Sequence, residues 1–244
     1  MIHYIVPMAG RGSRFMNKGY DYPKPLIEIY ERPFFYWATE SVRKYVEIAS
    51  LSFVVLKEHI EQFAIDERIT ELYPDASVII LPEVTEGAVI TCMKGISDIN
   101  DDLPLVFNDC DHLFKCYEFN SFCQKKDYSE IDGVILSFVS NKQDYSFVEK
   151  DNEGNVIRTA EKKAISNEAI CGCYYFKNKT IFMESAKEYL FECDYSEYYM
   201  SGIYNTMINN NRVVKSMLTD FHVPFGTPEE YVAAKSDIKY KELI

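Results

Sequence analysis

The chain has 244 residues, 47% of them hydrophobic and 26% charged, and its formal net charge is -12. This length is enough for one α/β domain with a buried core and short for several domains. The negative charge argues against nucleic acid as a partner, because binding a phosphate backbone requires a basic surface.

The sequence lacks the features of an inserted or secreted protein. It contains no apolar run of about 18 residues and does not begin with a signal peptide. Its seven cysteines are an odd number without a C-x-x-C pair, which suits reduced thiols better than disulfides or structural zinc. We therefore expect a cytoplasmic protein with no membrane partner. The sequence leaves the oligomeric state open, a homo-oligomer included.

The first half of the chain alternates between predicted strands and helices. Strands are predicted at residues 2–8, 51–56, 77–81 and 103–107, and helices at 34–46, 58–69 and 87–96. Such alternation is typical of a mostly parallel sheet with right-handed crossovers. We therefore predict a doubly wound α/β core.

The second half has a different rhythm. Strands are predicted at 133–140, 146–150, 170–176 and 212–217, and helices at 180–191 and 197–209. Residues 151–155 are a turn signal that predicts a β-hairpin. Thr227 and Pro228 have the residue types of a helix N-cap and first helical position, so a final helix is expected there. No linker separates the halves, and one domain over residues 1–244 is predicted.

Positive charge is concentrated at the start of this acidic chain. The first 24 residues hold four cations and one acid, namely Arg11, Arg14, Lys18, Lys24 and Asp21. A small positive region on an acidic body is what a site for an anionic small molecule would present.

Residues 10–15 (Gly-Arg-Gly-Ser-Arg-Phe) form a glycine-rich turn after the first predicted strand. Backbone N–H groups of such a turn can face phosphate oxygens, and its two arginines can neutralise them. The motif is not a dinucleotide fingerprint, because Phe15 takes the place of the third glycine. On its own it could equally be an ordinary tight turn.

Lys24 lies between Pro23 and Pro25. Proline fixes its own φ and restricts the preceding residue, so Lys24 is carried on a stiff backbone. A preorganised cation near a phosphate loop is what phosphoryl transfer needs, since that reaction depends on positioning and charge neutralisation. The alternative is a solvated loop lysine.

Asp109 and Asp111 follow directly after the strand predicted at 103–107. Ligands of open α/β sheets bind at the carboxyl ends of strands, and carboxylate oxygens there suit Mg²⁺ that bridges phosphates. The sequence thus predicts Asp111 and Asp109 as metal ligands, against the alternative of a solvated acidic loop.

Together, residues 7–15 and 23–26, separated by residues 16–22, resemble the signature of the sugar-phosphate nucleotidylyltransferase family. The resemblance implies a GT-A-like (Rossmann-like) fold, with a mixed, mostly parallel sheet and a hairpin and helices added in the second half. It implies catalytic roles for Arg14 and Lys24 at the nucleotide phosphates. The residues that it places around the nucleotide are Met8, Ala9, Gly10, Arg11, Gly12, Ser13, Glu83, Gly87 and Ala88.

The resemblance also assigns roles in the second half. Lys162 would be a catalytic cation for the acceptor phosphate, and the acceptor-binding residues would be Asp109, Glu161, Gly172 and Glu197. Residues 1–130 would then bind the nucleotide and residues 131–244 the acceptor.

Two departures from the family pattern occur, at Lys163 and Pro224. Lys163 stands where proline is usual, and Pro224 replaces an aspartate that supplies a second metal ligand. Asp220 or Asp109 could take over that role, or Asp111 and the substrate phosphates could suffice.

These observations predict a Mg²⁺-dependent nucleotidylyltransferase that transfers a nucleoside monophosphate from an NTP and releases pyrophosphate. The short chain and the variant loop resemble enzymes of capsule and surface-polysaccharide pathways, which favours CTP as donor. A phosphoglutamine-like compound or a sugar 1-phosphate is expected as acceptor. The alternatives are a GT-A glycosyltransferase, suggested by the spacing of Asp109 and Asp111, and a non-catalytic nucleotide-binding regulator, suggested by Pro224.

Overall fold

The computed structural model describes residues 1–125, 130–237 and 239–240. Its main sheet contains β1 (Ile2–Pro7), β4 (Ile48–Leu56), β5 (Ser77–Leu81), β6 (Leu105–Asn108), β8 (Gly133–Val139), β9 (Phe147–Lys150), β10 (Val156–Ala160), β11 (Glu168–Phe176) and β12 (Val214–Leu218). Two small sheets pair β2 (Glu28–Ile29) with β3 (Arg32–Pro33), and β7 (His112–Lys115) with β13 (Phe221–Pro224).

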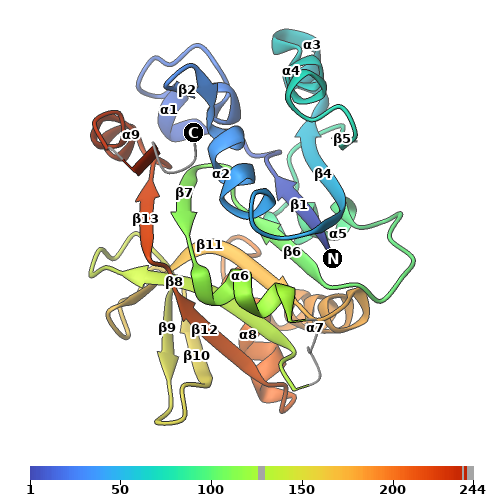
Figure 1. The fold of residues 1–244 in the computed structure, drawn as a ribbon, viewed down its shortest axis with the longest axis vertical. Helices are drawn as coiled ribbons and strands as arrows, with labels where there is room; N and C mark the ends of the chain where they lie inside the picture. Colours follow the sequence, from blue (N-terminus) through green and yellow to red (C-terminus); the bar gives the residue numbers. More distant parts are fainter. Residues whose placement is uncertain (126–129, 238, 241–244) are drawn as a thin grey trace.

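The helices lie between and over these strands (Figure 1). They are α1 (Ser13–Met16), α2 (Phe34–Arg43), α3 (Lys57–Phe63), α4 (Ile65–Leu72), α5 (Ala88–Gly95), α6 (Tyr117–Gln124), α7 (Lys179–Glu192), α8 (Met200–Asn209) and α9 (Pro228–Ala234), with a 3₁₀ turn η1 (Lys24–Leu26). Within the described ranges, no helix is both long and apolar enough to cross a membrane.

The main sheet is mixed, as the sequence predicts. Its strands run in the order β10-β9-β11-β6-β1-β4-β5, with β8 and β12 joined to β11 as a branch. The strands β6, β1, β4 and β5 are parallel, whereas β11 is antiparallel to its neighbours β6, β8 and β9. The predicted Rossmann-like α/β fold class is confirmed, and so is the hairpin formed by β9 and β10.

Apolar residues on both faces of β1 bury the sheet between two helical layers. Ile5 belongs to the core under α5, α7 and α8, whereas Tyr4 and Val6 belong to the core under α2, α4 and α6. Neighbouring residues of a strand point to opposite faces, so the continuous apolar run of β1 is required by burial on both sides.

The strand order places the site. From β1 the chain runs through β4 to β5 at one edge, then returns to form β6 on the other side of β1. The carboxyl ends of β1 and β6 therefore lie side by side at the point where the strand order reverses, where open α/β sheets bind ligands. Both predicted motifs follow these two strands.

Two predicted helices differ from the structure. The helix predicted at 58–69 is two helices, because Ala64 adopts a left-handed φ of 50° between α3 and α4. The helix predicted at 197–209 begins only at Met200, so Glu197 lies in the preceding segment. The final helix is confirmed, with Thr227 in a capping box with Glu230.

Gly95 of α5 tests the packing of the sheet. A Cβ atom there would lie 2.8 Å from Cγ2 of Val54 and 2.9 Å from Cγ2 of Ile5. We expect Gly95→Ala to destabilise the protein by about 1–3 kcal/mol through overpacking, measured as the free energy of unfolding in urea. Lys94→Ala, at an exposed position of the same helix, is the control. Equal stability of the two variants would contradict this packing.

Candidate active site

The glycine-rich loop follows the end of β1. Met8 and Ala9 are 2% and 3% exposed and their side chains pack in the two cores, so only their backbone can face a ligand. At Gly10 the chain reaches the surface, and a Cβ there would meet no atom within 4 Å. Arg11, Ser13 and Arg14 are exposed. The loop therefore presents backbone and cationic side chains to open space.

The loop and the Pro-Lys-Pro motif meet at Gly12. Gly12 has a left-handed φ of 61°, and a Cβ there would lie 3.1 Å from Cβ of Lys24. Glycine is thus favoured for backbone conformation and for space. Lys24 begins η1, directly after the buried Pro23. The stiff lysine that the sequence predicts is therefore held against the loop.

Lys24 reaches across to the end of β6. Its Nζ donates to Oδ2 of Asp111 at 2.7 Å, and both side chains are largely buried. Burial alone would lower the pKa of Lys24, but the charge of Asp111 and this hydrogen bond raise it above the ordinary value. Burial likewise opposes the charge of Asp111, yet Lys24 keeps the pKa of that carboxyl below the ordinary value. The predicted phosphate cation and metal ligand are thus in direct contact.

The pKa of Asp109 is shifted in the opposite direction to that of Asp111. Burial and the charge of Asp111 raise the pKa of Asp109 to about 7, against the opposing effect of Lys24. Its N–H donates to the carbonyl of Gly172 at 2.9 Å. Gly172 has a φ of 96°, and a Cβ there would lie 2.6 Å from Oδ2 of Asp109. Glycine at this position makes room for the carboxylate.

Gly226 does the same for Asp111, and the sequence analysis missed it. A Cβ at Gly226 would lie 2.5 Å from Oδ2 of Asp111, and the N–H of Phe225 donates to the Asp111 carbonyl at 3.0 Å. The signal in the sequence is the Gly226-Thr227-Pro228 turn, which follows closely after Pro224.

Asp220 does not replace the family aspartate. It precedes β13, whereas Pro224 ends that strand beside His112 of β7. The Oδ2 atom of Asp220 accepts from the N–H of Tyr117 at 2.8 Å, at the start of α6. Asp220 therefore lies at the far end of β13 from the site, and the alternative that assigned it to the metal is wrong.

A cavity of about 180 Å³ lies beside the two aspartates. Five of the predicted site residues line it, namely Arg14, Asp109, Asp111, Glu161 and Gly172. Other lining residues that the analysis of the sequence did not assign are Asp144, Tyr145, Ser146, His222, Gly226 and Glu230. The cavity thus joins the end of β6 to residues of the second half.

Glu161 and Lys162 follow the end of β10 and have different hydrogen-bond partners. Oε2 of Glu161 accepts from the hydroxyls of Ser146 and, at 3.1 Å, Ser201. Lys162 is exposed and does not line the cavity; its Nζ donates to the Tyr199 hydroxyl at 3.0 Å. That hydrogen bond raises the pKa of Lys162 above its ordinary value.

Gly87 packs against the backbone that precedes α8. A Cβ there would lie 2.4 Å from the nitrogen of Tyr198. The N–H of Tyr198 donates to the Glu86 carbonyl at 3.3 Å, and the N–H of Val89 donates to the Tyr198 carbonyl at 3.2 Å. Glu83 and Ala88 are exposed. Three of the predicted nucleotide-binding residues, Glu83, Gly87 and Ala88, do not line the cavity, and neither does Glu197.

Two histidines of the cavity are neutral at physiological pH. Burial lowers the pKa of His112 to about 4 and that of His222 well below its ordinary value. Nε2 of His112 lies 2.9 Å from Oδ1 of Asn108, whose amide group donates to Tyr4 and Ala38. The imidazoles therefore add no positive charge to the acid-rich cavity.

The two aspartates fit a magnesium ion that is brought with phosphates. Within the described residues, no group of three or more His, Cys, Asp or Glu side chains could hold a metal. Mg²⁺ commonly uses one or two carboxylates and takes its remaining ligands from substrate phosphates and water. Asp109 and Asp111 supply that number of hard oxygen ligands beside the loop.

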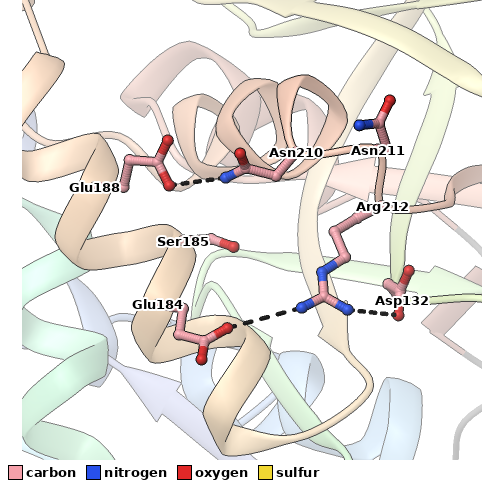
Figure 2. A pocket seen from close by; sticks show the side chains of 7 residues that line it. All are labelled: Asp132, Glu184, Ser185, Glu188, Asn210, Asn211 and Arg212. Atoms are coloured by element: carbon pink, nitrogen blue, oxygen red, sulfur yellow. Dashed lines mark hydrogen bonds and ion pairs between the residues drawn. The ribbon is translucent and has the colours of Figure 1, made fainter.

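A second cavity, of about 410 Å³, lies elsewhere (Figure 2). It is lined by residues of α7, by the segment that follows α8 and by Asp132. Arg212 there lies 3.8 Å from Asp132 and 3.7 Å from Glu184. None of the predicted site residues lines this cavity, and its arginine is paired with protein carboxylates.

The glycine-rich loop and the acidic pair lie at the switch point of a Rossmann-like sheet, where α/β proteins bind ligands. The sequence profile of the family described as nucleotidyl transferase matches residues 4–241. The chain therefore belongs to the nucleotidyl transferase family, whose members are enzymes of the nucleotidyltransferase class. No sequence among the curated proteins matches it.

Solved structures show the same fold. A nucleoside-diphosphate-sugar pyrophosphorylase from Vibrio cholerae RC9 superposes with a TM-score of 0.83 at 24% identity, over 96% of this chain and 100% of that one. The inositol-1-phosphate CTP transferase from T. maritima superposes with a TM-score of 0.76 at 14% identity, over 100% of this chain and 94% of that one.

Gly226 provides a test of the site geometry. Gly226→Ala places a Cβ against the Asp111 carboxylate and should disturb its contact with Lys24. We expect turnover, followed as pyrophosphate release, to fall at least about tenfold, equivalent to about 1.4 kcal/mol. Gly154→Ala is the matched control, because it strains a turn with φ of 79° and meets no atom within 4 Å. Unchanged turnover in Gly226→Ala would contradict the expectation that a Cβ at residue 226 displaces the Asp111 carboxylate.

The raised pKa of Asp109 predicts that the stability of the protein depends on pH. The pKa of Asp109 is raised in the folded state, so its contribution to stability is present below the ordinary pKa of 3.8 and is lost as pH rises towards about 7. Without metal, Asp109→Asn should therefore raise the thermal midpoint relative to wild type at about pH 8 and hardly change it at about pH 4. Asp75→Asn, at an exposed position, should show no such difference. The same shift at both pH values would contradict the raised pKa.

Proposed function

We propose that this protein is a Mg²⁺-dependent nucleotidylyltransferase that joins a nucleoside monophosphate from an NTP to a phosphorylated small molecule and releases pyrophosphate. The observation that carries the proposal is the 2.7 Å contact between Lys24 and Asp111 beside the glycine-rich loop. In this proposal the ammonium of Lys24 acts on the transferred phosphate, and the adjacent carboxylate of Asp111 holds the metal. We place this activity in the cytoplasm, in capsule or surface-polysaccharide synthesis.

The chemistry needs one bond to form and one to break. An oxygen of the acceptor phosphate attacks the α-phosphorus, and the bond from that phosphorus to the bridging oxygen of pyrophosphate breaks. Backbone N–H groups of residues 10–13 and the side chain of Arg14 hold the leaving phosphates, while Lys24 stabilises the charge that develops. Mg²⁺ bound by Asp111 and Asp109 would neutralise phosphate oxygens. No side-chain base is needed, since the attacking phosphate is already ionised.

The two halves of the single domain divide the substrates. We assign residues 1–130 to the nucleotide, with Glu83, Gly87 and Ala88 at the base, and residues 131–244 to the acceptor. In the acceptor half, Lys162 orients the phosphate, and Glu161, Gly172 and Glu197 bind the remainder, while Asp109 of the first half also binds the acceptor. The position of Glu161 and Gly172 in the cavity wall supports this division.

The charges of the cavity favour an acceptor that carries N–H donors. Asp144, Glu161 and Glu230 form no ion pair with any described residue; Glu161 accepts from hydroxyls and Glu230 from Tyr145 and its own helix cap. A carboxylate in a confined site gains from a cationic or N–H partner. A phosphoglutamine-like acceptor, which has an amino group, therefore suits this wall better than an unsubstituted sugar 1-phosphate.

CTP is our preferred donor. The preference rests on the resemblance of the loop to capsule-pathway enzymes, and the T. maritima neighbour, described as a CTP transferase, agrees with it. The acidic pair at Asp109 and Asp111 also suits a GT-A glycosyltransferase that uses a finished nucleotide sugar. That alternative gives Arg14 and Lys24 no role, because no pyrophosphate has to leave.

Pyrophosphate release tests the proposal. The protein is incubated with Mg²⁺ and each of CTP, UTP, GTP, ATP and dTTP, against a panel of phosphorylated amino acids, phosphoethanolamine, glucosamine 1-phosphate and glucose 1-phosphate. We expect release with CTP and an amine-bearing acceptor, and less with glucose 1-phosphate than with glucosamine 1-phosphate. A parallel incubation replaces the triphosphates with nucleotide sugars, and their breakdown, without pyrophosphate release from any triphosphate, would favour the glycosyltransferase. Nucleotide binding without either reaction would favour the regulator.

Lys24→Ala separates catalysis from binding. Because Lys24 is proposed to act on charge that develops in the transition state, its loss should lower kcat about a hundredfold and NTP affinity far less. Initial rates and calorimetric NTP binding measure the two effects. Lys18→Ala is the control, since Lys18 is exposed and lies 3.6 Å from Glu229 on the surface. Equal losses of rate and affinity in Lys24→Ala would remove the transition-state role.

A further inference from the structure

The beginning of α8 contacts two of the proposed acceptor residues, Lys162 and Glu161. The Tyr199 hydroxyl accepts from Nζ of Lys162 at 3.0 Å, and the Ser201 hydroxyl donates to Oε2 of Glu161 at 3.1 Å. The end of β10 is fastened to the same helix, because the Thr159 hydroxyl donates to the Ser201 carbonyl at 2.7 Å. Two adjacent residues of one half are thus held by two hydroxyls of another segment.

Lys162 is restricted more than an exposed lysine usually is. Its backbone has a left-handed φ of 51°, and its ammonium lies 4.9 Å from the centre of the Tyr199 ring, in addition to the hydrogen bond. A free lysine side chain loses considerable rotamer entropy when it binds a ligand. A cation–π contact and a hydrogen bond that already limit those rotamers reduce this cost.

The same segment is joined to the loop assigned to the nucleobase. Tyr198 exchanges backbone hydrogen bonds with Glu86 and Val89, at 3.3 Å and 3.2 Å. Gly87 has no space for a Cβ, which would lie 2.4 Å from the Tyr198 nitrogen. A shift of the 86–89 loop therefore has to move Tyr198, and Tyr199 follows it in the chain.

We propose that Tyr199 and Ser201 are positioning residues for Lys162 and Glu161, and that residues 198–201 transmit nucleotide binding at the 86–89 loop to Lys162. This inference rests on the proposed function, which assigns the loop to the nucleotide and Lys162 to the acceptor. Tyr199 touches neither substrate in this account. Tyr199 orients the ammonium of Lys162, and a nucleotide bound at the 86–89 loop holds Tyr199 in place.

The test measures the reactivity of the Lys162 amine, so it does not depend on knowing the acceptor. The full-length protein is acetylated briefly with acetic anhydride, and the modified fraction of each lysine is read by mass spectrometry. Lys163 is the internal control, because it is exposed and adjacent, whereas the hydrogen bond and the cation–π contact of Tyr199 are made with Lys162. Tyr199→Phe removes the hydroxyl and keeps the ring, and Tyr199→Leu removes both.

Loss of the hydroxyl should raise acetylation of Lys162 about fivefold relative to Lys163, the size expected for one net hydrogen bond. Tyr199→Leu should raise it further. Tyr195→Phe should leave it unchanged, because the Tyr195 ring lies against Tyr199 but the hydrogen bond of Lys162 goes to the Tyr199 hydroxyl. An unaltered Lys162 to Lys163 ratio in Tyr199→Leu, in a variant whose thermal midpoint matches wild type, would overturn the positioning role.

A second part of the experiment tests whether nucleotide binding at the 86–89 loop is transmitted to Lys162. Each of the five triphosphates is added with Mg²⁺ and no acceptor, and at least one should slow acetylation of Lys162 in wild type but not in Tyr199→Leu. Equal protection in both proteins would mean direct shielding and would overturn transmission, and so would the absence of protection by a triphosphate that binds in calorimetry. A chain that binds no triphosphate would instead fail the proposed function, while the acetylation ratio without nucleotide would still test Tyr199 as a positioning residue.

Discussion

The contact between Lys24 and Asp111 is the interaction on which the site depends. It joins a residue that follows β1 to one that follows β6, and two glycines make it possible from opposite sides. Gly12 lets the backbone of Lys24 approach the loop, and Gly226 leaves room for the Asp111 carboxylate. A largely buried charge without its partner is costly, so each residue requires the other while the phosphates and metal are absent. In the proposed reaction, a metal-bound triphosphate would give both charges new partners of opposite sign.

The remainder of the fold supports this pair in layers. Parallel pairing of β1 with β6 brings the two motifs to one edge of the sheet, and pairing of β7 with β13 returns the chain from Asp220 to Gly226 beside them. The antiparallel strand β11 adds Gly172 against Asp109. The result is a cavity lined by Arg14 on the side of the loop and by the carboxylates of Asp144, Glu161 and Glu230 on the side of the second half. This division of charge suits a donor rich in phosphate and an acceptor that carries N–H groups.

Local patterns were enough to predict the parts of the site that follow strands. Apolar runs located β1 and β6, and the structure brings the segments that follow these two strands together at the contact between Lys24 and Asp111. The missed features all depend on contacts between distant segments. Gly226 matters because of Asp111, and Gly87 is restricted by Tyr198, neither of which a window of neighbouring residues reveals. The wrong alternative for Asp220 has the same cause. Asp220 and Pro224 are close in the sequence, but they lie at opposite ends of strand β13.

The most direct test of this account is a crystal structure of the protein with CTP, Mg²⁺ and no acceptor. The account predicts the triphosphate along residues 10–14, the metal on Asp111, and Nζ of Lys24 turned from Asp111 to the α-phosphate, with the base beside Gly87. A triphosphate bound away from this loop, or an unbroken Lys24 to Asp111 contact with the α-phosphate out of reach of Lys24, would contradict it.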